Sequence, residues 1–308
     1  DMSTVGIVMA TYNGEKYVRE QIESILGNTY TEWKLWLWDD GSKDSTVSIL
    51  KEYEEKYPGK IIVYQNQENL GVVQNFLLGA KRCDTDYIMF CDQDDVWKKD
   101  KIRKTLEAMR ETEEKEGADY PVTVFSDVVV VDSELRKINP SFYQVSKLNT
   151  KKLDLNHLLM ENKLIGCTIM MNSPVKKLLT NLPKSARVHD WWIALITSAF
   201  GKIVYLPEAT MLYRQHENNV IGNENFLSYI QNRLRNLKKQ KQVLMDTQRQ
   251  AYEFLQIYKN ELSKEDKRVV YEFANLRNRN WFQRRYIIFT RGYLKTGLIR
   301  NLGVFLIV

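Results

Sequence analysis

Three carboxylates, Asp92, Asp94 and Asp95, lie together in the stretch MFCDQDDVW at residues 89–97. Two unit charges about 4 Å apart repel by roughly 1 kcal/mol in water and by about 4 kcal/mol at an effective dielectric constant near 20. Such a cluster persists where a cation binds or where each oxygen accepts a hydrogen bond. Paired carboxylates suit Mg²⁺ or Mn²⁺, which share their remaining positions with water and phosphate. The alternative is an acidic turn without a ligand, in which Asp95 caps the next helix.

A second acidic pair, Asp39 and Asp40, lies in WDDGS at residues 38–42. Carboxylates at the end of a strand can accept hydrogen bonds from the N–H of a base or from a ribose hydroxyl. The alternative is a turn without a ligand, because Asp-Gly is a favourable turn sequence.

His189 and Asp190 open a predicted helix that continues with Trp191 and Trp192. A carboxylate at a helix N-terminus is stabilised by the helix dipole, so capping alone would explain Asp190. In an enzyme, the same carboxylate can act as a general base toward an acceptor hydroxyl. The two indoles could stack on a sugar or belong to the core.

Arg214 and His216 lie in YRQHENN, at alternate positions and therefore on one side of a predicted strand. Arginine binds phosphate through paired hydrogen bonds, and neutral histidine is a common metal ligand. A structural role for the histidine is the alternative, although the chain has only three histidines.

The first hundred residues alternate between apolar runs and amphipathic segments, which predicts strands near 4–10, 34–40, 60–66 and 86–92 with helices between them. This alternation indicates right-handed βαβ units and a mainly parallel sheet, an α/β fold. Ligands of such sheets bind at the carboxyl ends of the strands. Three of the four strands end in TYN, DDGS and DQDD, so we expect a site there.

The remaining pattern is mixed. It predicts strands at 121–132 and 163–172, a helix at 187–201 and two short strands within 202–216. A long helical pattern covers 226–258 without Gly or Pro, and a further helix follows Ser263.

Charge divides the chain of 308 residues into two parts. Residues 226–308 contain 17 Lys and Arg against 6 Asp and Glu, and residues 1–225 contain 28 against 33. We therefore expect an α/β domain over 1–222 and a basic amphipathic helical region over 223–308. Three cysteines are too few for a disulfide framework, and no apolar leader precedes VGIVMA, so we expect a cytoplasmic protein.

Together, VMATYNGEKYVREQIESIL, WDDGSKDST, CDQDDVW and the HDWW and LYRQHENN stretches resemble the family 2 glycosyltransferases over about residues 4–220. The resemblance implies a GT-A fold, a nucleotide-binding α/β sandwich, in which Asp92-Gln93-Asp94 is the D-x-D metal motif. Within the family, CDQDDVW, HDWW and LYRQHENNVIG resemble bacterial rhamnosyltransferases of cell-surface polysaccharide assembly. The Q-x-x-R-W motif of processive members is absent, which indicates an enzyme that adds a single sugar.

The resemblance also implies roles for individual residues. Thr11, Tyr12, Asn13, Asp39 and Asp40 would border the nucleotide, with Asp92 near the ribose. Asp94, with His216, would bind Mg²⁺ or Mn²⁺ at the diphosphate. Asp190 would be the base of an inverting transfer. Arg214, His189, Trp191 and Asp95 would approach the diphosphate or the acceptor.

The implied donor is a dTDP- or UDP-linked sugar, with dTDP-rhamnose favoured over a UDP-hexose, and the acceptor is a glycan or a lipid-linked saccharide. The tail from Arg277 onward mixes cations with aromatic and aliphatic residues and contains no acid. Basic residues near an anionic leaflet contribute about 1 kcal/mol each, so we expect peripheral attachment to the cytoplasmic face of the bacterial cell membrane. The alternatives are packing on the domain, dimerisation, or a chain cut before a longer apolar segment.

Rival classes explain less of the sequence. A sugar-nucleotide pyrophosphorylase would carry a Gly-rich phosphate loop near the N-terminus, and a nicotinamide oxidoreductase would carry G-x-G-x-x-G after the first strand; neither is present. A non-catalytic adaptor for membranes or nucleic acid would explain the basic tail but not the acidic strand ends. We expect no nucleic-acid partner, and an oligomer is compatible with the sequence.

Overall fold

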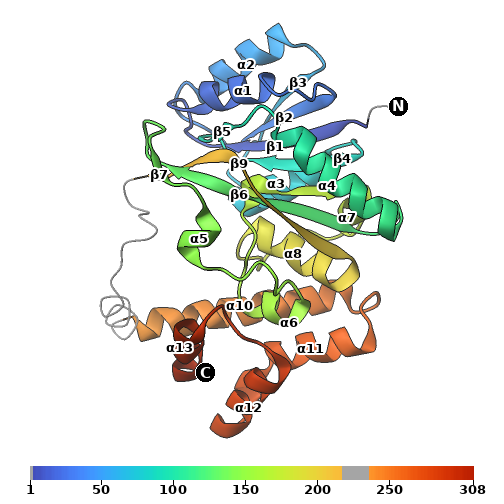
Figure 1. Ribbon diagram of the computed structural model, residues 1–308, viewed down its shortest axis with the longest axis vertical. Helices are drawn as coiled ribbons and strands as arrows, with labels where there is room; N and C mark the ends of the chain where they lie inside the picture. Colours follow the sequence, from blue (N-terminus) through green and yellow to red (C-terminus); the bar gives the residue numbers. More distant parts are fainter. Residues whose placement is uncertain (1–2, 217–235) are drawn as a thin grey trace.

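The computed structural model describes residues 3–216 and 236–308, which form an α/β fold around one nine-stranded sheet (Figure 1). The strand order is β3-β2-β1-β4-β8-β6-β9-β5, and β7 pairs with β6 beside this path. The strands are Val5–Thr11 (β1), Trp33–Asp39 (β2), Ile61–Gln65 (β3), Tyr87–Cys91 (β4), Val96–Trp97 (β5), Val122–Val131 (β6), Lys137–Asn139 (β7), Met170–Asn172 (β8) and Lys202–Arg214 (β9).

Helices connect the strands and cover both faces of the sheet. In the first part of the chain they are Val18–Leu26 (α1), Thr46–Lys56 (α2), Val72–Arg82 (α3), Lys101–Glu116 (α4), Phe142–Ser146 (α5), Leu155–Met160 (α6), Ser173–Lys177 (α7) and His189–Phe200 (α8). The C-terminal helices are Leu237–Tyr258 (α10), Lys264–Ala274 (α11), Trp281–Arg291 (α12) and Leu298–Ile307 (α13), and two 3₁₀ turns cover Gly166–Thr168 (η1) and Leu276–Asn278 (η2).

Strands β1 to β4 pair in parallel, as the alternating sequence pattern predicts. All seven residues of β1 and all five of β4 are buried, because helices cover both faces of this part of the sheet. Parallel strands end at the same edge, so the TYN, DDGS and DQDD segments come together there. The α/β fold predicted from the sequence is confirmed.

Two predicted elements differ in the structure. The predicted strand at 163–172 is reduced to Met170–Asn172, because the N–H of Thr168 bonds to the carbonyl of Ile165 at 3.0 Å and closes a 3₁₀ turn. The two short strands predicted within 202–216 are one strand, Lys202–Arg214. The register of β9 against β6 shifts between Ser126 and Asp127, and this shift leaves Pro207 in a β-bulge. Proline has no backbone N–H to donate to the sheet, and a bulge tolerates that loss.

The C-terminal helices lie at one end of the molecule, beneath α6 and α8 and opposite α1 and α2 (Figure 1). Their buried residues, among them Phe254 on α10 and Phe273 on α11, belong to the same hydrophobic cluster as Trp192 on α8. The predicted helical character of this region is confirmed for Leu237–Ile307. The predicted domain boundary after residue 222, and the start of the long helix at 226, lie outside the described residues.

Candidate active site

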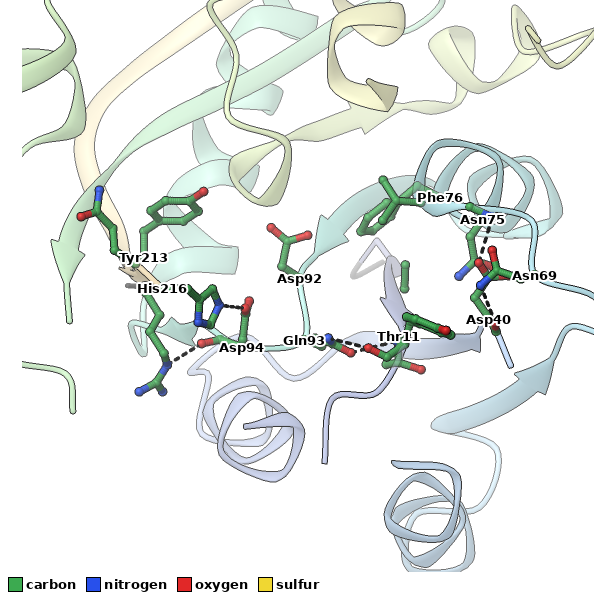
Figure 2. A pocket seen from close by; sticks show the side chains of 16 residues that line it. Thr11, Asp40, Asn69, Asn75, Phe76, Asp92, Gln93, Asp94, Tyr213 and His216 are labelled. Atoms are coloured by element: carbon green, nitrogen blue, oxygen red, sulfur yellow. Dashed lines mark hydrogen bonds and ion pairs between the residues drawn. The ribbon is translucent and has the colours of Figure 1, made fainter. Parts of the chain in front are cut away.

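A pocket of about 770 Å³ opens at the carboxyl ends of β1 and β4, beside the end of β9 (Figure 2). Asp40, Asn69 and Asn75 lie on one side of it and Asp94 and His216 on the other, with Asp92 between them. The pocket is lined by Ala10, Thr11, Tyr12, Asp40, Asn69, Gly71, Val72, Asn75, Phe76, Asp92, Gln93, Asp94, Tyr213, Arg214, Gln215 and His216. Its polar groups come from segments far apart in the sequence, as binding sites of this fold class require.

Gln93, the central residue of the D-x-D motif, joins the ends of β1 and β4. Its side chain accepts a hydrogen bond from the N–H of Tyr12 at 2.9 Å and donates one to the Tyr12 carbonyl at 3.1 Å. A Cβ at Gly14 would lie 2.2 Å from the same side-chain oxygen of Gln93. Glycine at this position therefore allows the two strand ends to stay in register.

Asp40 organises the loop that borders one end of the pocket. Its Oδ1 accepts from the N–H of Leu70 at 2.7 Å and from Asn66 at 2.9 Å, and its Oδ2 accepts from the N–H of Gly71 at 2.9 Å. The carboxylate lines the pocket although the residue is almost fully buried. Only its remaining lone pairs are free for a ligand.

Asp39 and Asn13, predicted at the nucleotide, do not line the pocket. Asp39 is buried, and its oxygens accept hydrogen bonds from the hydroxyls of Thr11 and Ser42 and from the N–H groups of Gly41 and Ser42. Asn13 accepts from the N–H of Lys43 at 2.8 Å. Both side chains hold the turn that follows β2, and Thr11 lines the pocket next to it.

Asp94 and His216 meet at the edge of the pocket, with 2.5 Å between Asp94 Oδ2 and His216 Nε2. Both side chains are partly exposed, so a cation held between them would keep open positions for water and phosphate oxygens. One carboxylate and one imidazole are ligands that suit Mg²⁺ or Mn²⁺. The pair therefore fits the metal that the D-x-D motif implies.

Arg214 lines the pocket, and its polar groups are bound to protein partners. Its Nε donates to the carbonyl of Asp94 at 2.7 Å, its guanidinium pairs with Glu20, and it lies 4.2 Å from the ring centre of Tyr17. Its backbone N–H donates to Asp95 Oδ1 at 2.9 Å. Arg214 thus holds the DQDD turn in place, and a diphosphate would reach its guanidinium only by displacing one of these partners.

Asp95 is buried, does not line the pocket and does not cap the following helix, whose N-cap is Asp100. Ligand atoms of Asp92, Asp95 and Cys167 all lie within 4.8 Å of one another. Burial raises the pKa of Asp95 and of the Cys167 thiol well above their ordinary values. Burial therefore disfavours the charged forms that would bind a cation, which makes this cluster a poorer metal site than Asp94 with His216.

Asp190 lies at the start of α8 and does not line the large pocket. Its Oδ1 accepts from Asn162 at 3.0 Å, and a Cβ at Gly166 would lie 3.1 Å from its Oδ2. Burial raises its pKa to about 6. Burial, together with the charges of Asp94 and Asp190, raises the pKa of Asp92 to about 7, so Asp190 acts electrostatically on a residue that lines the pocket.

His189 and Trp191, predicted at the diphosphate or acceptor, are both buried. The imidazole of His189 stacks on Phe76, 4.1 Å between ring centres, and burial lowers its pKa to about 3. A neutral ring packed in this way supports Phe76, which lines the pocket. Trp191 donates its indole N–H to the carbonyl of Leu158 at 2.5 Å and faces a second, smaller pocket.

The sequence profile described as "Glycosyl transferase family 2" matches residues 6–174. This chain belongs to glycosyl transferase family 2. It is 30% identical over 226 residues to a dTDP-rhamnosyl transferase, RfbG, of Shigella flexneri, covering 70% of this chain and 73% of the relative. It is 36% identical over 222 residues to a putative teichuronic acid biosynthesis glycosyltransferase, TuaG, of Bacillus subtilis, covering 71% and 82%.

Solved structures show the same fold. The S. aureus protein TarS (residues 1–349) in complex with UDP-GlcNAc superposes with a TM-score of 0.59 at 18% identity, covering 88% of this chain and 72% of TarS. The mannosyltransferase PcManGT of Pyrobaculum calidifontis, in complex with GDP-Man and Mn²⁺, gives 0.56 at 13% identity, covering 95% and 74%. The GT-A fold predicted for this glycosyltransferase is confirmed.

Several residues near the site were missed from the sequence. Asn69, Asn75, Phe76 and Tyr213 line the pocket, and Asn162 binds Asp190. The asparagines on either side of Gly71 were a usable signal, because polar residues at the start of a helix that follows a parallel strand lie at the ligand edge. Nothing local to Asn162 indicates its partner 28 residues later.

Proposed function

We propose that this glycosyltransferase moves a sugar, rhamnose from dTDP-rhamnose, onto a hydroxyl of a glycan or lipid-linked saccharide in surface polysaccharide synthesis. The observation that carries the proposal is the large pocket of this family 2 chain, which both D-x-D carboxylates line and at whose edge Asp94 contacts His216. The choice of rhamnose is supported by the similarity to RfbG.

The donor would lie with its base near Asp40 and Tyr12 and its ribose near Asp92. Asp94 and His216 would hold Mg²⁺ or Mn²⁺, which when bound offsets the negative charge of the leaving diphosphate. Arg214 would fix the DQDD turn through the Asp94 carbonyl, so that the metal ligands keep their positions. Asp39 and Asn13 would act on the nucleotide only through the turn that they hold.

Asp190 would act as the general base. The acceptor oxygen attacks the anomeric carbon, the bond from that carbon to the diphosphate oxygen breaks, and the nucleoside diphosphate leaves with the electron pair. The acceptor proton passes to the Asp190 carboxylate. Attack from the face opposite the leaving group inverts the anomeric configuration. Asn162 would hold the carboxylate in place during this transfer.

The donor assignment is tested by incubating the protein with dTDP-rhamnose or UDP-glucose and Mn²⁺ and measuring the released nucleoside diphosphate. We expect release from dTDP-rhamnose, with or without an added acceptor. Release from UDP-glucose alone would replace the rhamnose assignment by a UDP-hexose donor. Release from neither, together with salt-dependent binding to duplex DNA, would favour the adaptor alternative.

The pKa of Asp190 predicts the acid limb of the pH profile. A base must be deprotonated, and burial raises this pKa to about 6, so kcat/KM for transfer at pH 5 should be about a tenth of its plateau. Initial rates between pH 4.5 and 8 would measure this, with nucleotide binding followed over the same range as the control. A flat profile down to pH 4.5 would contradict a base with a raised pKa.

We propose that the C-terminal helices lie at the cytoplasmic membrane surface and that the acceptor approaches from there. Large apolar side chains are exposed three or four residues apart along the two last helices, and we call them the exposed apolar stripe: Phe282, Tyr286 and Phe289 on α12, and Leu298, Leu302 and Leu306 on α13. Arg285 on α12 donates to the carbonyl of Phe305 on α13 at 2.6 Å, so the two helices are neighbours.

The positive charge of the last two helices indicates which kind of surface the exposed apolar stripe would bind. No acidic residue follows Glu272 in the sequence, so the stripe is accompanied by cations alone, which suits an anionic lipid surface. No helix of residues 3–216 and 236–308 combines the length and apolar character that a membrane crossing requires.

Replacing both Phe282 and Phe289 with Ser should weaken binding to phosphatidylglycerol vesicles by about tenfold or more, because each buried aromatic ring contributes about 1.5–3 kcal/mol. Vesicle flotation measures the bound fraction. Ile138→Ser, at an exposed apolar residue on β7, is the matched control and should bind like the wild type. Equal binding of the double variant would show that the stripe does not face the membrane.

A further inference from the structure

A second pocket, of about 270 Å³, lies between the catalytic fold and the C-terminal helices. Its lining comes from α6, α8, α10 and α13 and from the segments between them, and includes Asn162, Arg187 and Trp191. Most of the lining residues lie beyond the segment matched by the family profile.

Residues next to Asp190 in the chain, or hydrogen-bonded to it, reach both the smaller pocket and the large pocket. Asn162 lines the smaller pocket and donates to Asp190 Oδ1 at 3.0 Å, and the next residue, Trp191, lines it as well. On the other side, the ring of His189, the residue before Asp190, stacks on Phe76, which lines the large pocket, with 4.1 Å between ring centres. A carboxylate placed between an acceptor pocket and a donor pocket can remove a proton from the acceptor as the acceptor attacks the donor.

The lining of the smaller pocket is apolar at one side and cationic at another. Val243, Leu244, Val304 and Ile307 form an aliphatic wall from α10 and α13. The guanidinium of Arg187 donates to the hydroxyl of Thr247 at 3.2 Å and lies 5.8 Å from the ring centre of Trp191. Among residues 3–216 and 236–308, no carboxylate forms an ion pair with it.

The lining also contains one carboxylate, Glu161, whose negative charge would repel an anionic ligand if it had no partners. Glu161 Oε1 accepts from the N–H and hydroxyl of Thr296 at 2.8 and 2.7 Å and pairs with Lys163 at 3.2 Å. These partners offset its charge, and they lower its pKa against the effect of burial. The guanidinium of Arg187 is therefore a charge available to a ligand, and it suits a phosphate.

We propose that the smaller pocket binds the acceptor, and that the acceptor is a saccharide joined through phosphate to an apolar chain. The phosphate would meet Arg187, the first carbons of the chain would pack on Val243 and Val304, and the saccharide hydroxyl would point toward Asp190. Helix α13 forms part of this wall and also carries half of the exposed apolar stripe, so the chain would continue toward the lipid surface. The assignment rests on the proposed sugar transfer.

The test uses decyl phosphate as the probe, below its micelle concentration, and isothermal titration calorimetry on the whole chain. We expect decyl phosphate to bind, decyl maltoside to bind more weakly, and inorganic phosphate not to bind measurably. Val243→Trp, which fills the pocket, and Arg187→Gln, which removes the guanidinium, should each weaken decyl phosphate binding by about tenfold, the equivalent of 1.4 kcal/mol. Ile138→Trp, away from both pockets, should leave it unchanged.

Binding of dTDP with Mn²⁺ is measured on the same samples, which also checks that each variant is folded. Loss of decyl phosphate binding with nucleotide binding retained supports the assignment. Equal decyl phosphate binding by wild type and both variants, or no binding by the wild type, overturns it. If decyl phosphate binding follows the pocket variants but no nucleotide binds, the lipid-phosphate pocket stands and the proposed transferase reaction fails.

Discussion

Asp190→Asn is expected to lower kcat for sugar transfer by about 10³-fold, because general-base catalysis contributes about 10²–10⁴ to a rate. Asn keeps the size of the side chain and can still accept from Asn162, so the pocket geometry should persist. The Kd of the nucleotide should not change, since Asp190 does not line the large pocket. Initial-rate kinetics and calorimetric titration with dTDP measure the two quantities.

Stability provides the control for this variant. The pKa of Asp190 is raised to about 6, so the folded state binds its proton more tightly than the unfolded state. Above that pH the buried carboxylate costs stability, which is regained as the pH falls through 6. Asp190→Asn should therefore melt no lower than the wild type at pH 7.5. A rate within tenfold of the wild type would remove Asp190 from the mechanism.

Asp94→Ala is expected to abolish the metal-dependent stabilisation by nucleotide. A ligand at 100 times its Kd adds about 2.7 kcal/mol to the free energy of unfolding. In the wild type this shift should require Mn²⁺ as well as dTDP, because Asp94 and His216 would hold the metal at the diphosphate. Thermal unfolding with dTDP, with Mn²⁺ and with both, on both proteins, measures the effect.

Two further variants make this result specific. His216→Ala should weaken the metal requirement in the same direction, and Asp119→Ala, an exposed acid, should behave like the wild type. If Asp94→Ala keeps the full shift, the metal lies elsewhere, and the cluster of Asp92, Asp95 and Cys167 becomes the site to test. If dTDP shifts the wild type equally without Mn²⁺, the metal dependence is wrong.

Local sequence pattern determined the first four strands and their helices, because hydrophobic periodicity and turn residues act over short distances. It also placed TYN, DDGS and DQDD at one edge, since parallel strands must end together. It could not show that Asp39 turns inward while Asp40 lines the pocket. That difference depends on the direction of two adjacent side chains within one turn, and hence on hydrogen bonds to residues elsewhere in the chain.

Only the tertiary structure decided which distant groups meet. Asp94 and His216 are 122 positions apart, and their contact depends on the antiparallel pairing of β5, which follows Asp94, with the end of β9. Arg214 was predicted at the diphosphate, and the fold surrounds it with Glu20, Tyr17 and the DQDD turn. The basic composition of the tail was visible in the sequence. Its packing against α6 and α8, which creates the smaller pocket beside Asp190, depends on side-chain complementarity between segments that no local pattern connects.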